Sequence, residues 1–276
     1  MLRPASYAIA HWIEPGDQAR AIHGPVTGRL IGQAGGAPLD VQGMLDWARS
    51  TGGPALRAMT FHQRAKMVKA LALYIGARKE QLYEINPLTG ATRRDGDVDI
   101  DGGIGTMLVM ASKGRQNLPD GYVYVDGDVE LLSRGGQFLG QHIAVPMQGV
   151  AVHINAFNFP IWGMLEKLAP TLLAGMPAIV KPATQTCYLT EACFRMIIES
   201  GLLPDGAVQL VIGGVGDMLD RLGAQDVVSF TGSANTALHL RSNPHLMRQS
   251  VRFHAEQDSL NATILGPDVV TNSVTF

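Results

Sequence analysis

The 276-residue sequence contains little of what redox, metal and nucleic-acid sites require. Its two cysteines, Cys187 and Cys193, lie six residues apart, a spacing that fits neither a CxxC redox pair nor a zinc site. The eight histidines form no HxxxH or HxH pattern, so we expect no metal centre. The net charge is −2 and lysine and arginine form no block, which argues against a nucleic-acid partner.

Long hydrophobic runs are also missing. The longest apolar stretch, residues 168–180, is too short to span a bilayer and is interrupted by Pro170 and Pro177. The first residues contain no sustained hydrophobic segment before His11. The composition, 46% hydrophobic and 17% charged, is that of a globular chain. We therefore expect a soluble, cytoplasmic protein without a membrane partner.

The patterns that are present change along the chain. The first fifty residues are rich in glycine and proline and carry short alternating runs, which predict edge strands and turns. Residues 60–86 predict a helix that begins with a capping box of Thr60 and Gln63, and residues 98–116 predict a second helix. Residues 122–148 alternate apolar and polar residues around Asp-Gly and Gly-Gly pairs, which predicts a β-hairpin that leaves the domain as an arm.

After residue 149, runs that predict strands alternate with runs that predict helices, and a last strand is predicted over residues 261–266. This order is typical of parallel βαβ units. The predicted fold is therefore α/β, with a Rossmann-type doubly wound parallel sheet and helices on both faces. Because ligands bind beyond the carboxyl ends of the strands in such sheets, the residues that follow each strand are candidates for a site.

The first three strand ends carry polar or glycine-rich segments. In NAFNFP, Asn158 offers an amide beside a helix start, either to hold a developing oxyanion or to cap the helix. In KPAT, Lys181 either reaches a ribose hydroxyl or a phosphate, or extends into solvent as a surface lysine. In GGVGD, the backbone around Gly214 either approaches a ligand or only forms a turn.

The last two strand ends suggest an anion site and a base. FTGS contains Thr231, Gly232 and Ser233 and opens a helix whose unpaired amides suit a pyrophosphate, although the same residues serve equally as an N-cap. Glu256 closes the fifth strand, either as a solvated carboxylate or as a general base in a dry site. Taken one at a time, all five segments permit both interpretations.

Taken in order, the segments resemble the motifs of the aldehyde dehydrogenase family. AFNFP resembles the family's Pro-Trp-Asn-Phe-Pro, KPAT its Lys-Pro-Ser/Ala-Glu, and AEQDSLN the Glu-Leu-Gly-Gly-Lys segment that carries the general base, while FTGS is shared. A narrower resemblance covers nearly the whole chain and is strongest in TGATRRDGDVDIDGGIGT and VAVHINAFNFPIWGMLEKLAP. These segments resemble the dehydrogenase half of the ring-opening proteins of bacterial phenylacetate degradation and the semialdehyde dehydrogenases of the benzoyl-CoA pathway.

The resemblance implies the oxidation of a CoA-linked semialdehyde to its acid. A cysteine thiolate attacks the aldehyde, Asn158 holds the oxyanion, a nicotinamide accepts the hydride, and Glu256 activates the water that hydrolyses the thioester. Thr184 stands where NAD-preferring members have a glutamate, and the loss of that charge favours NADP, with NAD as the alternative. The residues implied in cofactor binding are Phe157, Lys181, Thr184, Gly214, Thr231, Gly232 and Ser233, and no metal is implied.

The cysteine nucleophile that the resemblance implies has no counterpart in the sequence. The family places this cysteine farther beyond its glutamate than the twenty residues that follow Glu256, and none of these twenty is a cysteine. Cys187 and Cys193 fall on the adenosine side of the predicted cofactor site. We therefore expect the chain to be the N-terminal part of such a dehydrogenase and to be inactive toward aldehydes on its own. The alternative is a nucleotide-binding module that functions without catalysis.

The resemblance also divides the chain into four predicted parts. Residues 1–121 are the N-terminal part of a cofactor-binding domain, and residues 122–148 are a hairpin arm that joins the intact enzyme into a dimer. Residues 149–270 form the Rossmann-like core, and residues 271–276 begin a catalytic domain.

Overall fold

The protein is described by a computed structural model that covers residues 1–262, 264 and 266. Its main sheet has seven described strands in the order β11-β10-β7-β8-β9-β1-β2. The strands from β11 to β9 are parallel, whereas β1 and β2 join antiparallel. These strands are β1 Ser6–Ala8, β2 His11–Ile13, β7 Ala151–Ile154, β8 Ala178–Lys181, β9 Val208–Leu210, β10 Val227–Gly232 and β11 Arg252–Gln257.

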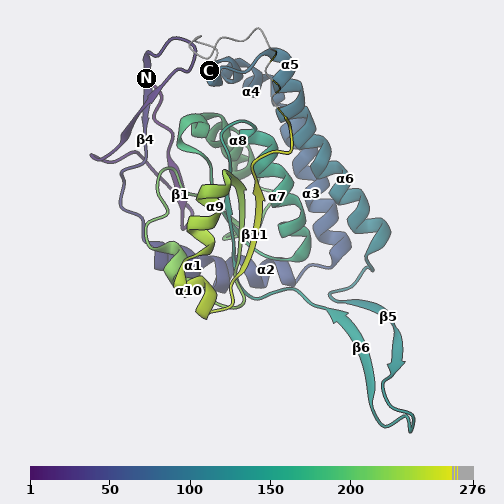
Figure 1. The fold of residues 1–276 in the computed structure, drawn as a ribbon. Coiled ribbons are helices and arrows are strands. Elements are labelled where there is room, and N and C mark those ends of the chain that lie inside the picture. The colour runs from purple at the N-terminus through teal and green to yellow at the C-terminus, as the bar shows by residue number, and fades with distance from the viewer. Residues whose placement is uncertain (263, 265, 267–276) are drawn as a thin grey trace.

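Helices cover both faces of the sheet (Figure 1). One face carries α3 Phe61–Gly76, α6 Gly102–Asn117, α7 Pro160–Ala174 and α8 Cys187–Glu199, and the other carries α1 Val41–Trp47, α9 Ala234–Arg241 and α10 Pro244–Arg248. The other helices are α2 Gly53–Arg57, α4 Lys79–Ile85 and α5 Arg93–Gly96, with π-helical turns at Ala48–Gly52 and Asp97–Asp101 and 3-10 turns at Asn86–Thr89, Thr184–Thr186 and Met218–Arg221. Among the described residues, no helix combines the length and the hydropathy that a membrane span needs.

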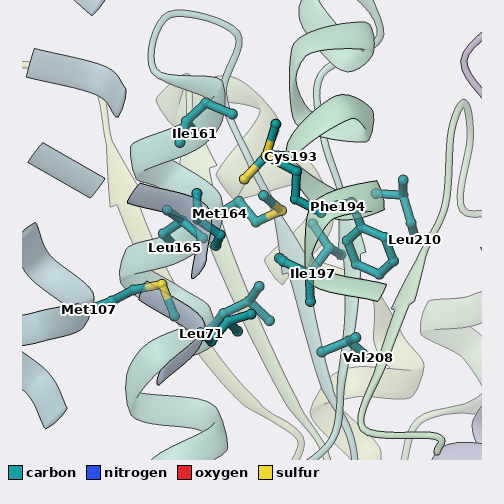
Figure 2. Close-up of a cluster of buried hydrophobic side chains, with 14 of the residues drawn as sticks. Leu71, Met107, Ile161, Met164, Leu165, Cys193, Phe194, Ile197, Val208 and Leu210 are labelled. Carbon is teal, nitrogen blue, oxygen red and sulfur yellow. The ribbon is translucent and has the colours of Figure 1, made fainter. Parts of the chain in front are cut away.

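The apolar strands are buried on both sides. Ala178 and Val180 of β8 belong to the core beneath α7 and α8, while Ile179 belongs to the core beneath α1 and α9. This follows from strand geometry, because successive side chains point to opposite faces of a sheet. Figure 2 shows the first core, in which Met164 of α7 and Phe194 of α8 pack without solvent exposure.

The structure confirms most of the predicted elements. The α/β fold with a parallel sheet and helices on both faces is present, and α3 begins at the predicted capping box of Thr60 and Gln63. The predicted hairpin forms as β5 Tyr124–Leu131 and β6 Leu139–Ala144 and extends away from the sheet (Figure 1). A second two-stranded pair consists of β3 Arg20–His23 and β4 Leu30–Ala34.

Three predictions of secondary structure were wrong. The helix predicted over residues 60–86 is divided, since α3 ends at Gly76 and α4 begins at Lys79. The first fifty residues contain α1, which begins where the Asp40 carboxylate accepts a 2.9 Å hydrogen bond from the Gly43 N–H. The strand predicted over residues 261–266 does not form at 261, 262, 264 or 266. The backbone turns into the left-handed region at Asp258, with φ at 54°, directly after β11. The predicted part 271–276 lies outside the described residues.

Candidate active site

The strand order reverses between β7 and β10. From β7 the chain continues through β8 and β9 on one side, and then forms β10 and β11 on the other side of β7. The helices that follow β7 and β10 leave toward opposite faces, since α7 packs on one face and α9 on the other. Doubly wound sheets bind ligands at the carboxyl ends of the two strands between which the order reverses.

The five predicted segments emerge at this edge of the sheet. Ile154 of β7 pairs with Phe230 of β10, and one residue later Thr231 pairs with Glu256 of β11. Neighbouring strands lie about 4.8 Å apart, so Glu256 is about 10 Å from the end of β7. Asn158 follows β7 by four residues and therefore leaves the sheet at the same edge as Glu256.

Glu256 is exposed and borders an open groove. The Thr231 hydroxyl donates a 3.2 Å hydrogen bond to its carboxylate. The groove, of about 800 Å³, runs between α7 and the strands β7, β10 and β11. In the part of the chain that the structure describes, the carboxylate is thus solvated and not enclosed in a dry pocket.

The groove also contains an ion pair and a buried imidazole that the sequence did not single out. The Lys167 ammonium lies 3.0 Å from the Glu166 carboxylate and donates to the Gly163 carbonyl at 3.3 Å. The His153 Nε2 lies 3.0 Å from the Thr171 hydroxyl oxygen. Burial, and to a lesser extent the charge of Lys167, lowers the pKa of His153 to about 3, so this imidazole is neutral near pH 7.

Asn158 lies on the exposed loop between β7 and α7. It is not the cap of the helix, because Phe159 occupies the N-cap position and the Asp99 carboxylate accepts from two backbone N–H groups of the first turn. The Thr186 hydroxyl donates a 3.0 Å hydrogen bond to the Phe157 carbonyl and so anchors the same loop. Within residues 1–262, 264 and 266, the Asn158 side chain makes no hydrogen bond, which leaves its amide available to a ligand.

The FTGS segment ends β10 and begins α9. Ser233 is the N-cap of this helix, and its hydroxyl oxygen accepts a 3.2 Å hydrogen bond from the Thr236 N–H. The N–H of Ala234 donates at 2.8 Å to the carboxylate of Asp258, a residue to which the sequence assigned no role. A carboxylate therefore occupies the helix start for which an anion was predicted.

The ends of β8 and β9 present a cation and a glycine turn. Lys181 ends β8, Thr184 follows in the next turn, and burial lowers the pKa of the Lys181 ammonium. At Gly213, φ is 109° and a Cβ would lie 3.2 Å from the Cα of Gly35, so packing requires glycine there. A Cβ at Gly214 would meet no heavy atom of the described residues within 4 Å, so these residues leave open space there.

Both cysteines lie in α8 and not at the site. Cys193 is completely buried among apolar side chains (Figure 2). Burial raises the pKa of Cys187 to about 12 and raises the pKa of Cys193 as well. Because the thiolate is the nucleophilic form of cysteine, neither thiol suits attack on an aldehyde.

Comparison with known proteins finds relatives along the whole chain. The model of the aldehyde dehydrogenase family matches residues 12–274. The 3,4-dehydroadipyl-CoA semialdehyde dehydrogenase of Aromatoleum evansii is 41% identical over 276 residues, which is 100% of this chain and 53% of that protein. The NAD(+) benzaldehyde dehydrogenase of Pseudomonas putida is 27% identical over 231 residues, which is 81% of this chain and 45% of that protein.

Solved structures share the fold. A double mutant of the betaine aldehyde dehydrogenase of Staphylococcus aureus, in complex with NAD+, superposes with a TM-score of 0.79 at 25% identity, covering 94% of this chain and 51% of that one. The chain spans about half the length of the curated relatives that it matches. Because the family model matches most residues of the chain, the chain belongs to the aldehyde dehydrogenase family.

Proposed function

We propose that the chain forms the nucleotide-binding part of an NADP-dependent dehydrogenase that oxidises a CoA-linked semialdehyde to its acid. The observation that carries the proposal is that five strand-end segments lie along the carboxyl edge of one parallel sheet, whose strand order reverses between β7 and β10. The substrate class is supported by the 41% identity to a relative that is itself a CoA-semialdehyde dehydrogenase.

The residues at the carboxyl edge of the sheet fit the diphosphate and the adenosine ribose of NADP. The start of α9 takes the diphosphate in place of the Asp258 carboxylate, to which the Ala234 N–H donates in this structure. At the end of β8, the Lys181 ammonium and the Thr184 hydroxyl suit the adenosine ribose and its 2′-phosphate, because residue 184 carries no carboxylate that would repel the phosphate. When bound, NADP supplies the acceptor for the hydride of the aldehyde.

Asn158 and Glu256 contribute the remaining chemistry of this half. The Asn158 amide donates a hydrogen bond to the aldehyde oxygen as negative charge develops on it. Glu256 takes the proton of the water that attacks the thioester. That thioester requires a cysteine thiolate, which the buried Cys187 and Cys193 do not supply. We therefore expect the 276 residues alone to bind NADP without oxidising aldehydes.

Titration of NADP against tryptophan fluorescence tests the proposal. Trp162 lies in the first turn of α7, close to the Asn158 loop, and replacement of Trp12 and Trp47 by phenylalanine leaves it as the single reporter. We expect a saturable change with NADP and no aldehyde-dependent formation of NADPH. A flat titration of the folded protein would contradict nucleotide binding. Turnover of an aldehyde would contradict the lack of a nucleophile.

A nucleotide-binding module without catalysis is the second candidate. The burial of both thiols favours it, because the binding of a nucleotide requires no nucleophilic cysteine. The coding sequence after Phe276 separates the two functions, since a cysteine-bearing segment in the same frame favours the dehydrogenase.

A further inference from the structure

The acidic π-helical turn Asp97–Asp101 lies against the start of α7 and has no part in the function proposed above. Turns of this kind are rare and occur frequently at functional sites. Its middle carboxylate, Asp99, is only 3% exposed, whereas Asp97 and Asp101 lie at the surface. A charged group buried in this way raises the question of what it holds.

Asp99 caps α7 from a distant part of the chain. One of its carboxylate oxygens accepts from the Ile161 N–H at 3.0 Å and from the Trp162 N–H at 2.7 Å. The first turn of a helix leaves such N–H groups without an intrahelical partner. The N-cap residue of α7, Phe159, provides no side-chain acceptor, so Asp99 provides it instead.

The outer residues of the turn are clamped by a side-chain network. The Tyr83 hydroxyl lies 2.9 Å from the Asp97 carboxylate and 2.8 Å from the Asp101 carboxylate. The Lys79 ammonium binds Asp101 at 2.6 Å, and the Arg93 guanidinium lies 3.5 Å from the centre of the Tyr83 ring. Both ends of the turn are therefore fixed while its middle residue reaches inward.

Two glycines allow the turn to approach α7. A Cβ at Gly102 would lie 2.7 Å from a ring carbon of Trp162, and a Cβ at Gly103 would lie 3.0 Å from the Trp162 Cα. A larger residue at either position would push α6 away from the first turn of α7. The segment DIDGG thus combines the buried acceptor with the close approach that its hydrogen bonds need.

We infer that Asp99 is a positioning residue for the loop that carries Asn158. Asn158 precedes Ile161 by three residues, so the two hydrogen bonds fix the backbone on which the loop is built. Burial raises the pKa of Asp99 to about 6 although the two N–H donors lower it. The inference rests on the proposed function, because the task of Asn158 comes from there.

Hydrogen exchange of residues 155–162 in the 276-residue chain tests the inference. In Asp99→Ala the two N–H groups lose their acceptor, and we expect the amides of this segment to exchange at least about tenfold faster. In Asp99→Asn the amide oxygen replaces the carboxylate oxygen, and exchange should return to within about threefold of the parent protein. Asp99→Ser, which retains a shorter acceptor, replaces Asp99→Ala if that variant does not fold.

Thr60→Ala is the matched control. The Thr60 hydroxyl oxygen accepts from the Gln63 N–H at 3.2 Å, so this variant also loses a helix cap, but at α3. It should lower the thermal midpoint without changing the exchange of residues 155–162. Unchanged exchange in Asp99→Ala, or the same change in Thr60→Ala, would overturn the positioning role.

The NADP titration of the same variants adds a functional readout. Phe157, which the resemblance implies in cofactor binding, lies on the same loop as Asn158. We therefore expect Asp99→Ala to weaken NADP binding by about tenfold, Asp99→Asn by much less, and Thr60→Ala not at all. If the parent protein binds no NADP while the exchange pattern holds, the proposed function fails and the positioning role stands. If the parent protein binds NADP and exchange is unchanged in Asp99→Ala, the positioning role fails and the proposed function stands.

Discussion

At the scale of single residues, the proposed function places Thr184, a residue without charge, beside the ribose of the nucleotide at the end of β8. Thr184→Glu places a carboxylate there, and repulsion of the 2′-phosphate should weaken NADP binding by at least about tenfold while NAD binding changes little. Calorimetric titration of both nucleotides measures the ratio of the two dissociation constants. Thr184→Gln is the neutral control of the same length. An unchanged ratio in Thr184→Glu would remove this residue from cofactor selection.

The candidate site residues that the sequence singled out are those with a local signal. Asn158, Lys181 and Glu256 each lie at or just after the end of a strand, so the alternation of strands and helices identified them. Asp99 lies inside an acidic helical run, and its partner is 62 residues away. Asp258 acquires its role only when β11 is placed beside β10, which brings its carboxylate to the start of α9.

At the scale of elements, Arg64 joins the carboxyl-terminal ends of α2 and α7. Its guanidinium donates to the carbonyls of Leu173 at 2.7 Å and Leu56 at 3.1 Å, and also to that of Met59. Burial lowers the pKa of Arg64 to about 10, so the group stays charged near pH 7. Arg64→Met leaves these carbonyls without a donor, and the free energy of unfolding should fall by about 3 kcal/mol.

Urea denaturation measures this loss, and Arg78→Met serves as the control. Arg78 lies just after α3, the helix that carries Arg64, and is half-buried. Within the described part of the chain it donates only to the Tyr74 carbonyl, at 3.2 Å. Its replacement should cost less than about 1 kcal/mol. Equal losses in the two variants would show that Arg64 does not join the helices.

Elements were predictable where the sequence carries its own boundary signal. The capping box of Thr60 starts α3, and left-handed Gly175 ends α7. The apolar residues in 261–266 have the alternation of a strand but give no sign of the turn at Asp258, which depends on a contact with α9. Helix α1 was missed because its start depends on the single side chain of Asp40.

At the scale of the whole molecule, His153 makes stability depend on pH. Its pKa is about 3 in the folded protein and 6.5 as an ordinary value. The neutral imidazole therefore contributes stability that is fully present above pH 6.5 and is lost as the pH falls from there toward 3. Between pH 7 and pH 5, His153→Gln should lose less free energy of unfolding than the parent protein, by about 1–2 kcal/mol.

Urea denaturation at the two pH values measures this difference. Asp99 has the opposite effect on stability. The free-energy cost of burying its charge is fully present above pH 6 and disappears as the pH falls toward 3.8, the ordinary pKa of the group. Since the parent protein and His153→Gln share Asp99, the difference between them isolates the histidine. The exposed His239 supplies the control His239→Gln, which should follow the parent protein. Parallel curves for all three proteins would refute the role of His153.

The outer edge of β11 has a consequence for handling the chain. One edge of this strand pairs with β10, and among the described residues no strand pairs with the other. Five of its six side chains are exposed, so the backbone N–H and C=O groups along that edge form a template that another extended chain can join. With a net charge of only −2, copies repel one another weakly. We therefore expect the outer edge of β11 to be one of the places at which copies of the chain pair when the chain is concentrated.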